Sequence, residues 1–172
     1  MDNLYVIAGL ILLTIIYKII TWNKRNKTGS LNIDGMLIWI DNGQQTKPFF
    51  NQKYKIMGKP DLLYKMNKGG VLAVEYKHRF KNIYKSDIVQ AQCAALAARG
   101  DNYPVDEILI KTKNTEKYIK LPTSDDELYG IIQEYVLSTR KANHGKNLSA
   151  IPNNYKCKSC AYRNSCTYHF TY

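Results

Sequence analysis

The first strong feature of the chain is a long apolar run near its N-terminus. Residues 4–20 read LYVIAGLILLTIIYKII, in which Thr14 and Lys18 are the main polar interruptions. The length suits a transmembrane helix, which needs roughly 17 to 25 predominantly apolar residues. We therefore expect contact with a membrane through residues 4–22, with a buried core helix as the alternative.

The residues that follow this run indicate its orientation. Lys24, Arg25 and Lys27 come directly after the apolar residues, and such positive charges mark the cytoplasmic side of a span. We expect a single-pass anchor over residues 1–23 and a polar linker over 24–33. The rest of the chain would then be cytoplasmic.

Beyond the linker, the apolar pattern changes to short strand-like runs and two helix-like segments. An Ala-rich helix is expected over 87–99, ended by Gly100, and a second over 124–141 with Ser124 as its N-cap. Strands are expected over 35–41, 53–58, 61–66, 71–77, 107–113 and 118–121. The first four read as a meander, and the whole order predicts one mixed α/β domain over 34–172.

The charge of the chain narrows its partners. Its 172 residues include 25 Lys and Arg against 14 Asp and Glu, which gives a net charge of +11. Such a charge suits DNA or an anionic membrane surface, although it also serves simple solubility. No G-x4-G-K-[ST] element is present, so an intrinsic ATPase is not expected.

Three charged residues on neighbouring predicted strands could carry chemistry. Asp61 follows Gly58-Lys59-Pro60, and Glu75 and Lys77 end the next strand on one face, because side chains alternate along a strand. Two carboxylates can hold Mg²⁺ or Mn²⁺, and a lysine beside the ion can act on water or on a phosphate. The alternative is an ordinary solvated strand face with an aspartate in a turn.

The wider motif resembles a known family. It consists of G-K-P-D at 58–61, V-L-A-V-E-Y-K-H-R at 71–79, an Ala-rich helix at 87–99, and a terminal C-x2-C-x5-C. Together these resemble the RecB-like PD-(D/E)XK nucleases, most closely the CRISPR-associated Cas-four exonucleases. The resemblance covers 57–169 and implies a restriction-endonuclease-like core, with a mixed sheet flanked by helices.

The resemblance also implies roles for single residues. Asp61 and Glu75 match the metal-binding acids, and Tyr76 would offer its backbone carbonyl to the metal. Lys77 matches the catalytic lysine. Gln90 matches a helix glutamine that contacts the DNA or that lysine.

The chain departs from the family pattern at two points. Ala94 stands where the family has a tyrosine, and no histidine precedes His78. Asp34 and Asp41 are then the nearby candidates for an upstream metal ligand. His78 and the adjacent Arg79 are expected to face either a phosphate backbone or water.

The tail over 155–170 contains a cluster of cysteines: Cys157, Cys160 and Cys166. By the resemblance, these match three of the four thiolates that hold a [4Fe-4S] cluster. Cys93 could supply the fourth ligand, although a lone cysteine in such a helix is usually a core thiol. His169 could instead complete a zinc or iron site, or the site could be degenerate.

These features together predict a metal-dependent DNA nuclease, an exonuclease acting on ends or single strands at the cytoplasmic face of a membrane. The alternative is a catalytically impaired DNA-binding or complex-forming module of the same fold. A membrane-surface structural protein is a third reading, which leaves the three charged residues unexplained. Partners in CRISPR adaptation and antiviral defence, in phage or mobile-element metabolism, or in DNA repair are all compatible.

Overall fold

The computed structural model describes residues 11–18, 31, 33–146, 148, 157–158, 160–161 and 163–166. The elements labelled in order are β1 (Gly35–Ile40), η1 (Gly43–Gln45), β2 (Phe49–Asn51), β3 (Ile56–Gly58), β4 (Leu62–Met66), β5 (Val71–Tyr76), α2 (Lys85–Gly100), β6 (Val105–Lys111), β7 (Glu116–Lys120), α3 (Asp125–Asn143) and η2 (Arg163–Ser165). The chain forms two compact units, Met1–Ile132 and Gln133–Tyr172.

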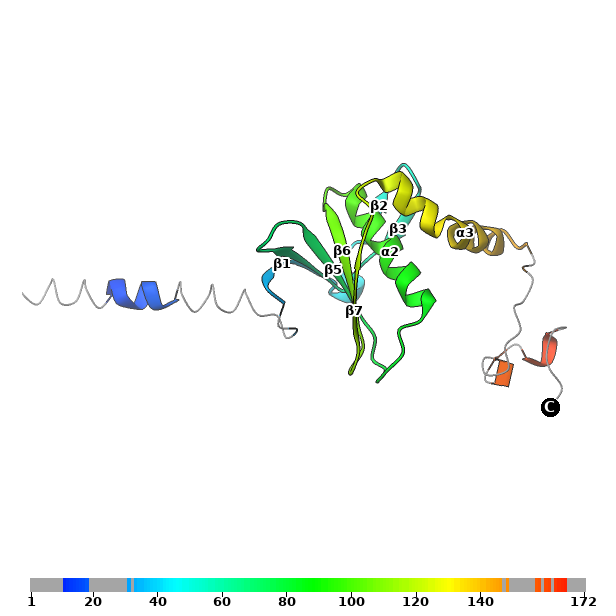
Figure 1. Cartoon of the computed structure of the whole chain (residues 1–172), viewed down its shortest axis with the longest axis horizontal. Helices are drawn as coiled ribbons and strands as arrows, with labels where there is room; N and C mark the ends of the chain where they lie inside the picture. The colour runs from blue at the N-terminus through cyan, green and yellow to red at the C-terminus, as the bar shows by residue number, and fades with distance from the viewer. Residues whose placement is uncertain are drawn as a thin grey trace, which may run out of the picture. The chain divides into compact units, whose positions relative to one another are not determined.

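A five-stranded sheet with the order β1-β4-β5-β6-β7 is the centre of the first unit (Figure 1). All neighbouring pairs are antiparallel except β5 and β6, which are parallel. A parallel pair needs a crossover connection, and α2 provides it. The expected mixed α/β fold with flanking helices is therefore confirmed, although β6 begins at Val105, two residues before its predicted start.

The predicted four-strand meander is wrong in one respect. Only Ile56–Gly58 of the expected strand 53–58 is extended, and it pairs with the unpredicted β2 in a separate two-stranded sheet. Lys55 adopts a φ of 50°, which interrupts the extended backbone before β3. Asn51 of β2 fastens this hairpin to α2, because its buried amide Nδ2 donates to the Leu96 carbonyl at 2.9 Å.

Helix α2 contacts β5 and β6 of the main sheet and also the β2–β3 hairpin. Its small side chains permit the close packing: Ala94 is buried, and a β-carbon at Gly58 would lie 3.0 Å from Ala94 Cα. A large aromatic side chain at position 94 would meet the hairpin. The alanine there follows from the tight contact between α2 and β3.

The opposite face of the sheet carries a second apolar cluster. Ile33, which precedes β1, packs with four sheet residues: Tyr64, Leu72, Val74 and Leu109. Each of these residues is at most 5% exposed. Ile33, just before β1, therefore covers part of this face. The two layers hold β5 rigidly between them.

Gly100 does not end α2 in the expected way. The helix includes Gly100, and the left-handed residue after it is Asn102, with a φ of 66°. A β-carbon at position 100 would lie 2.5 Å from Asn51 Cα and 2.7 Å from the Phe50 carbonyl oxygen. The glycine is needed because the hairpin approaches the helix here.

Helix α3 begins as predicted. The Ser124 hydroxyl accepts from the Asp126 amide at 3.2 Å, so the proposed N-cap is confirmed. Leu128 and Ile132 are buried on the part of α3 that belongs to the first unit.

Most of the predicted membrane anchor lies outside the described residues. Of residues 1–30, the structure describes 11–18, which are helical with exposed side chains. Within the part of the chain that the structure describes, no helix has the length and apolar character to cross a membrane.

We expect Gly100→Ala to lower the free energy of unfolding by about 1–3 kcal/mol, because the new methyl group would collide with the β2 backbone. Gly130→Ala is the matched control. Its β-carbon would have no neighbour within 4 Å, and alanine favours a helix over glycine by up to about 1 kcal/mol. Urea titration of both variants measures the difference, and equal stabilities would contradict the close packing of α2 on the hairpin.

Candidate active site

Three polar side chains meet at the C-terminal end of β5, on the side of the sheet that α2 covers. Glu75 is 5% exposed, and Lys77 follows two residues later on the same face. Lys77 Nζ lies 2.8 Å from Glu75 Oε1 and 2.8 Å from Gln90 Oε1. Gln90 Nε2 in turn donates to Glu75 Oε1 at 2.9 Å, which closes a ring of three hydrogen bonds.

Burial controls the electrostatics of this ring. The pKa of Glu75 is raised, first because burial disfavours its charged form, and further because the Asp61 carboxylate is nearby. The hydrogen bond from Lys77 acts in the opposite direction. The site therefore favours additional positive charge beside Glu75.

Asp61 is held against both neighbouring strands. Its N–H donates to the Val74 carbonyl at 3.0 Å, and its carbonyl accepts from the Asp41 amide at 2.9 Å. Its Oδ2 accepts from the Tyr76 amide at 2.6 Å. Since the N–H and C=O of an extended residue point to the same strand edge, the Tyr76 carbonyl also faces the Asp61 side of β5.

The oxygen donors at this end of the sheet suit a small hard cation. Asp61 and Glu75 offer carboxylates, the Tyr76 carbonyl faces the same edge, and both hydrogen bonds to Glu75 use Oε1 rather than Oε2. Mg²⁺ commonly binds one or two carboxylates and keeps several waters. Among the described residues, no group of three His, Cys, Asp or Glu side chains gathers as a metal site. The two carboxylates and the carbonyl are donors of the kind that Mg²⁺ or Mn²⁺ binds.

The two upstream aspartates are engaged elsewhere. Asp34 precedes the far end of β1, where its Oδ1 accepts from Asn67 Nδ2 at 2.5 Å. Asp41 neighbours Asp61 through the backbone, but its Oδ1 accepts from Lys59 Nζ at 2.7 Å and from the Gly43 amide at 2.9 Å. Neither joins Asp61 and Glu75 in a three-carboxylate group.

Arg79 is bound by protein groups rather than only facing solvent. Its guanidinium pairs with the buried Asp87, its Nε donates to the Asn82 carbonyl at 2.9 Å, and it lies 4.8 Å from the Tyr84 ring centroid. Burial alone would raise the pKa of Asp87, but the hydrogen bonds from Arg79 and from the Tyr84 amide lower it. These contacts fasten the loop after Lys77 to the start of α2.

Sequence reasoning missed Asp87 as the partner of Arg79. The available signal was an acid three residues after the N-cap of a helix, where its side chain can accept a hydrogen bond from the N-cap amide. The Tyr84 amide does donate to Asp87 Oδ2, at 2.8 Å. His78 packs edge-on against the Tyr76 ring, with the centroids 5.1 Å apart.

The cysteine tail belongs to the second unit. Cys160 N donates to the Cys157 carbonyl at 3.3 Å, and Cys166 N donates to the Arg163 carbonyl at 3.3 Å, so the three cysteines lie on successive turns. They are not among any three-ligand metal group within the described residues, and His169 lies outside those residues. Cys93 lies half-buried in α2 of the first unit, and burial raises the pKa of its thiol.

We expect Glu75→Gln to be at least as stable as the wild type at neutral pH when divalent ions are absent. Because the pKa of Glu75 lies above its ordinary value of 4.5, the native state binds more protons in the window between the two values. The free energy of unfolding therefore falls as pH rises through that window, and glutamine removes this contribution.

Urea unfolding across that pH range in EDTA measures the effect. Glu107→Gln on β6, whose side chain is half-buried, is the control. If Glu75→Gln were less stable than the wild type at neutral pH, the contact with Lys77 would outweigh the burial of the charge.

Comparison with known proteins bears on the family of the chain. The search of curated proteins gave no match. A crystal structure of a protein named SSO0001 is similar at a TM-score of 0.45 and 17% identity, over 95% of this chain and 72% of the other, which carries no argument about function.

A family model, the PD-(D/E)XK nuclease superfamily, matches residues 13–167. The letters of that motif stand in this chain as Pro60-Asp61 and as Glu75, Tyr76 and Lys77. This match covers far more than half of the sequence and includes the ring of hydrogen bonds at the end of β5. The chain therefore belongs to the PD-(D/E)XK nuclease superfamily.

Proposed function

We propose that the chain is a Mg²⁺- or Mn²⁺-dependent deoxyribonuclease that hydrolyses phosphodiester bonds at the C-terminal end of β5. The observation that carries this proposal is the Lys77 ammonium group, held at 2.8 Å from both Glu75 and Gln90. A lysine fixed beside a buried carboxylate, at the position of the superfamily lysine, is suited to phosphate chemistry.

Asp61, Glu75 and the Tyr76 carbonyl would hold the metal ion. When bound, such an ion supplies Lewis acidity toward a phosphate oxygen and makes water a better nucleophile. Without a metal, Asp61 accepts a hydrogen bond from the Tyr76 amide, and this bond aligns the ends of β4 and β5.

Lys77 would orient the attacking water or stabilise the negative charge that develops on the phosphate. Its flexible side chain needs a support for that role, and Gln90 provides one from α2. Gln90 also bonds to Glu75, so it fixes the separation between the acid and the lysine. We therefore assign Gln90 as a positioning residue for Lys77.

The preference for DNA is supported by charge as well as by family. The net charge of +11 favours a polyanion, and binding of that kind weakens as salt rises.

Exonuclease action, and partners in CRISPR adaptation or DNA repair, are proposed from the resemblance to Cas-four exonucleases alone. A catalytically impaired DNA-binding module is the second candidate, favoured by the lack of a histidine before His78 and by Ala94 in place of the family tyrosine.

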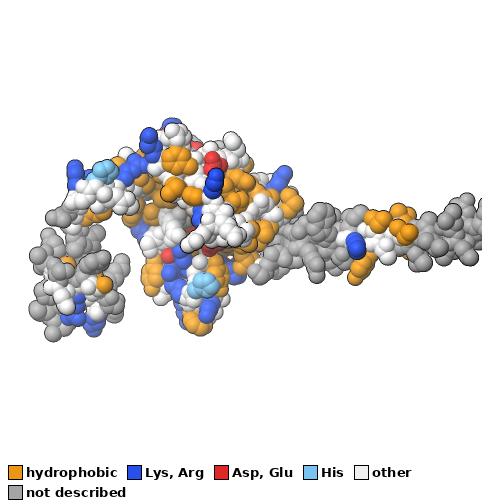
Figure 2. Space-filling view, turned by 180° about the vertical axis from the view of Figure 1, so that it is seen from behind, with side chains coloured by type: hydrophobic (Ala, Val, Ile, Leu, Met, Phe, Trp, Pro, Cys, Tyr) orange, Lys and Arg blue, Asp and Glu red, His pale blue; other side chains and the backbone are white. Residues whose placement is uncertain are grey.

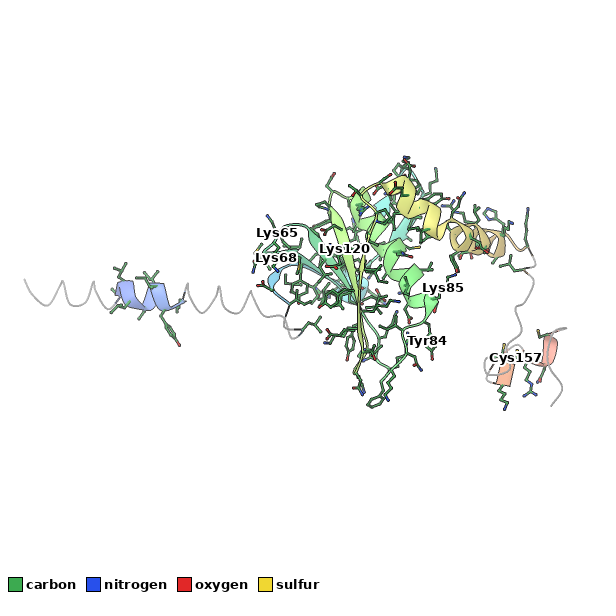
Figure 3. All side chains as sticks on the ribbon, in the orientation of Figure 1. Lys65, Lys68, Tyr84, Lys85, Lys120 and Cys157 are labelled. Carbon is green, nitrogen blue, oxygen red and sulfur yellow. The ribbon has the colours of Figure 1, made fainter. Side chains whose placement is uncertain are left out.

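We expect Lys77→Ala and Asp61→Ala each to reduce Mg²⁺- or Mn²⁺-dependent cleavage of DNA by about 100-fold or more, because each removes a group that acts on the phosphate or its metal. Lys68→Ala, in the turn at the opposite end of β5, is the control and should cleave normally (Figure 3). Equal rates for the wild type and Lys77→Ala would refute the catalytic assignment. DNA binding without any metal-dependent cleavage would favour the second candidate.

For the tail, we propose a [4Fe-4S] cluster on Cys157, Cys160 and Cys166, with zinc as the alternative ion. The support is the C-x2-C-x5-C spacing and the successive turns that carry the three residues. Anaerobically purified full-length protein should contain iron and absorb visible light, and Cys160→Ser should lose both. Zinc alone, or no metal, would overturn the cluster.

We also propose that residues 4–22 anchor the chain in a membrane, with the rest of the chain on the cytoplasmic side. The support is the apolar run and the basic residues after it. Release of the full chain from membranes by alkaline carbonate would contradict this proposal.

A further inference from the structure

Beside the ring of Glu75, Lys77 and Gln90, two segments form a projection that we call the tip. It consists of loop residues 78–84 and turn residues 112–115. Two large aromatic side chains on the loop are exposed, Phe80 at 64% and Tyr84 at 51%. Figure 3 shows Tyr84 where this loop joins α2, beside Lys85.

Hydrogen bonds hold the two segments of the tip together. The Lys113 amide donates to the Arg79 carbonyl at 3.0 Å, and the Asn114 amide donates to the Phe80 carbonyl at 3.0 Å. The buried Thr112 hydroxyl lies 3.2 Å from that same Phe80 carbonyl. Together with the pair between Arg79 and Asp87, these bonds fix the backbone on both sides of Phe80.

The tip also carries positive charge next to its aromatic rings. Lys113 Nζ lies 4.4 Å from the centroid of the Phe80 ring, within the range of a cation–π contact. Lys81 and Lys85 are exposed on the same loop and at the start of α2. Figure 2 shows basic and hydrophobic side chains close together at the lower end of the core.

An exposed phenylalanine on a rigid loop contributes little to the core, so its position calls for another explanation. Phe80 follows Lys77 by three residues, which limits their separation along the chain to about 11 Å. This distance is on the order of the length of three stacked nucleotides in one strand. The backbone of Phe80 therefore lies within a few nucleotides' length of the backbone of Lys77.

We propose that Phe80 stacks on an unpaired base next to the scissile phosphate and that Lys113 binds an adjoining phosphate. This inference rests on the nuclease proposal. Within the single strand or free end expected from the sequence, it assigns the side chains that would contact an unpaired base and the phosphate beside it. A base inside a duplex is already stacked on both faces, so Phe80 can stack only on an unpaired base or on a base at the end of a strand.

The test is a binding experiment on the full chain in EDTA, which removes divalent ions and so prevents metal-dependent cleavage. Fluorescence anisotropy gives Kd for three probes: an oligothymidine strand, an abasic sugar-phosphate strand of equal length, and a blunt duplex. Phe80→Ala is compared with Phe80→Trp, which keeps an aromatic face. Tyr118→Ala on β7, 51% exposed and not one of the residues of the tip, is the matched control.

We expect Phe80→Ala to weaken binding of oligothymidine about 5- to 150-fold, the range measured for one aromatic–base stack. Binding of the abasic strand should change less than about 2-fold because it has no bases, and binding of the blunt duplex should change far less than that of oligothymidine because only its terminal base pairs have a free face. Phe80→Trp should restore wild-type binding, and Tyr118→Ala should leave all three Kd values unchanged.

Two results would overturn the inference: no effect of Phe80→Ala on any probe, or an equal loss on all three probes. The two proposals fail separately. Lys77-dependent cleavage with no effect of Phe80→Ala would reject base stacking alone. A base-dependent effect of Phe80→Ala in a protein that never cleaves DNA would support stacking and reject the nuclease.

Discussion

The buried carboxylate of Glu75 constrains the whole site, because a charge taken out of water must be matched by opposite charge or by hydrogen bonds. Lys77 and Gln90 meet that requirement from two different elements. The same burial that raises the pKa of Glu75 also makes the site attractive to a divalent ion. The position of Lys77 is thus a consequence of where β5 is buried.

Helix α2 makes this arrangement possible. Gln90 reaches Glu75 only because the helix lies close to the sheet, and the helix lies close because its inner residues are small. Gly58 against Ala94, and Gly100 against Asn51, are two places where α2 and the β2–β3 hairpin leave no room for a β-carbon on the glycine. Local backbone packing on one side of α2 therefore sets side-chain geometry on the other.

The loop after β5 links the ring of Glu75, Lys77 and Gln90 to the tip. Arg79 is held by Asp87 at the start of α2, and the carbonyls of Arg79 and Phe80 accept from the turn after β6. A loop fixed at both ends can present an aromatic ring to a ligand with little loss of conformational entropy on binding. The rigidity that positions Lys77 would also position Phe80.

The sequence by itself determined the features that depend on local order along the chain. Alternation along β5 put Glu75 and Lys77 on one face, and the Ser124 hydroxyl marked the start of α3. Tertiary structure decided what depends on contacts between distant residues. The three-residue β2 is too short to produce a pattern, and the need for glycine at position 100 comes from Asn51, far away in sequence. The local pattern of apolar and polar residues does not predict such contacts, because they form only when separate elements pack together.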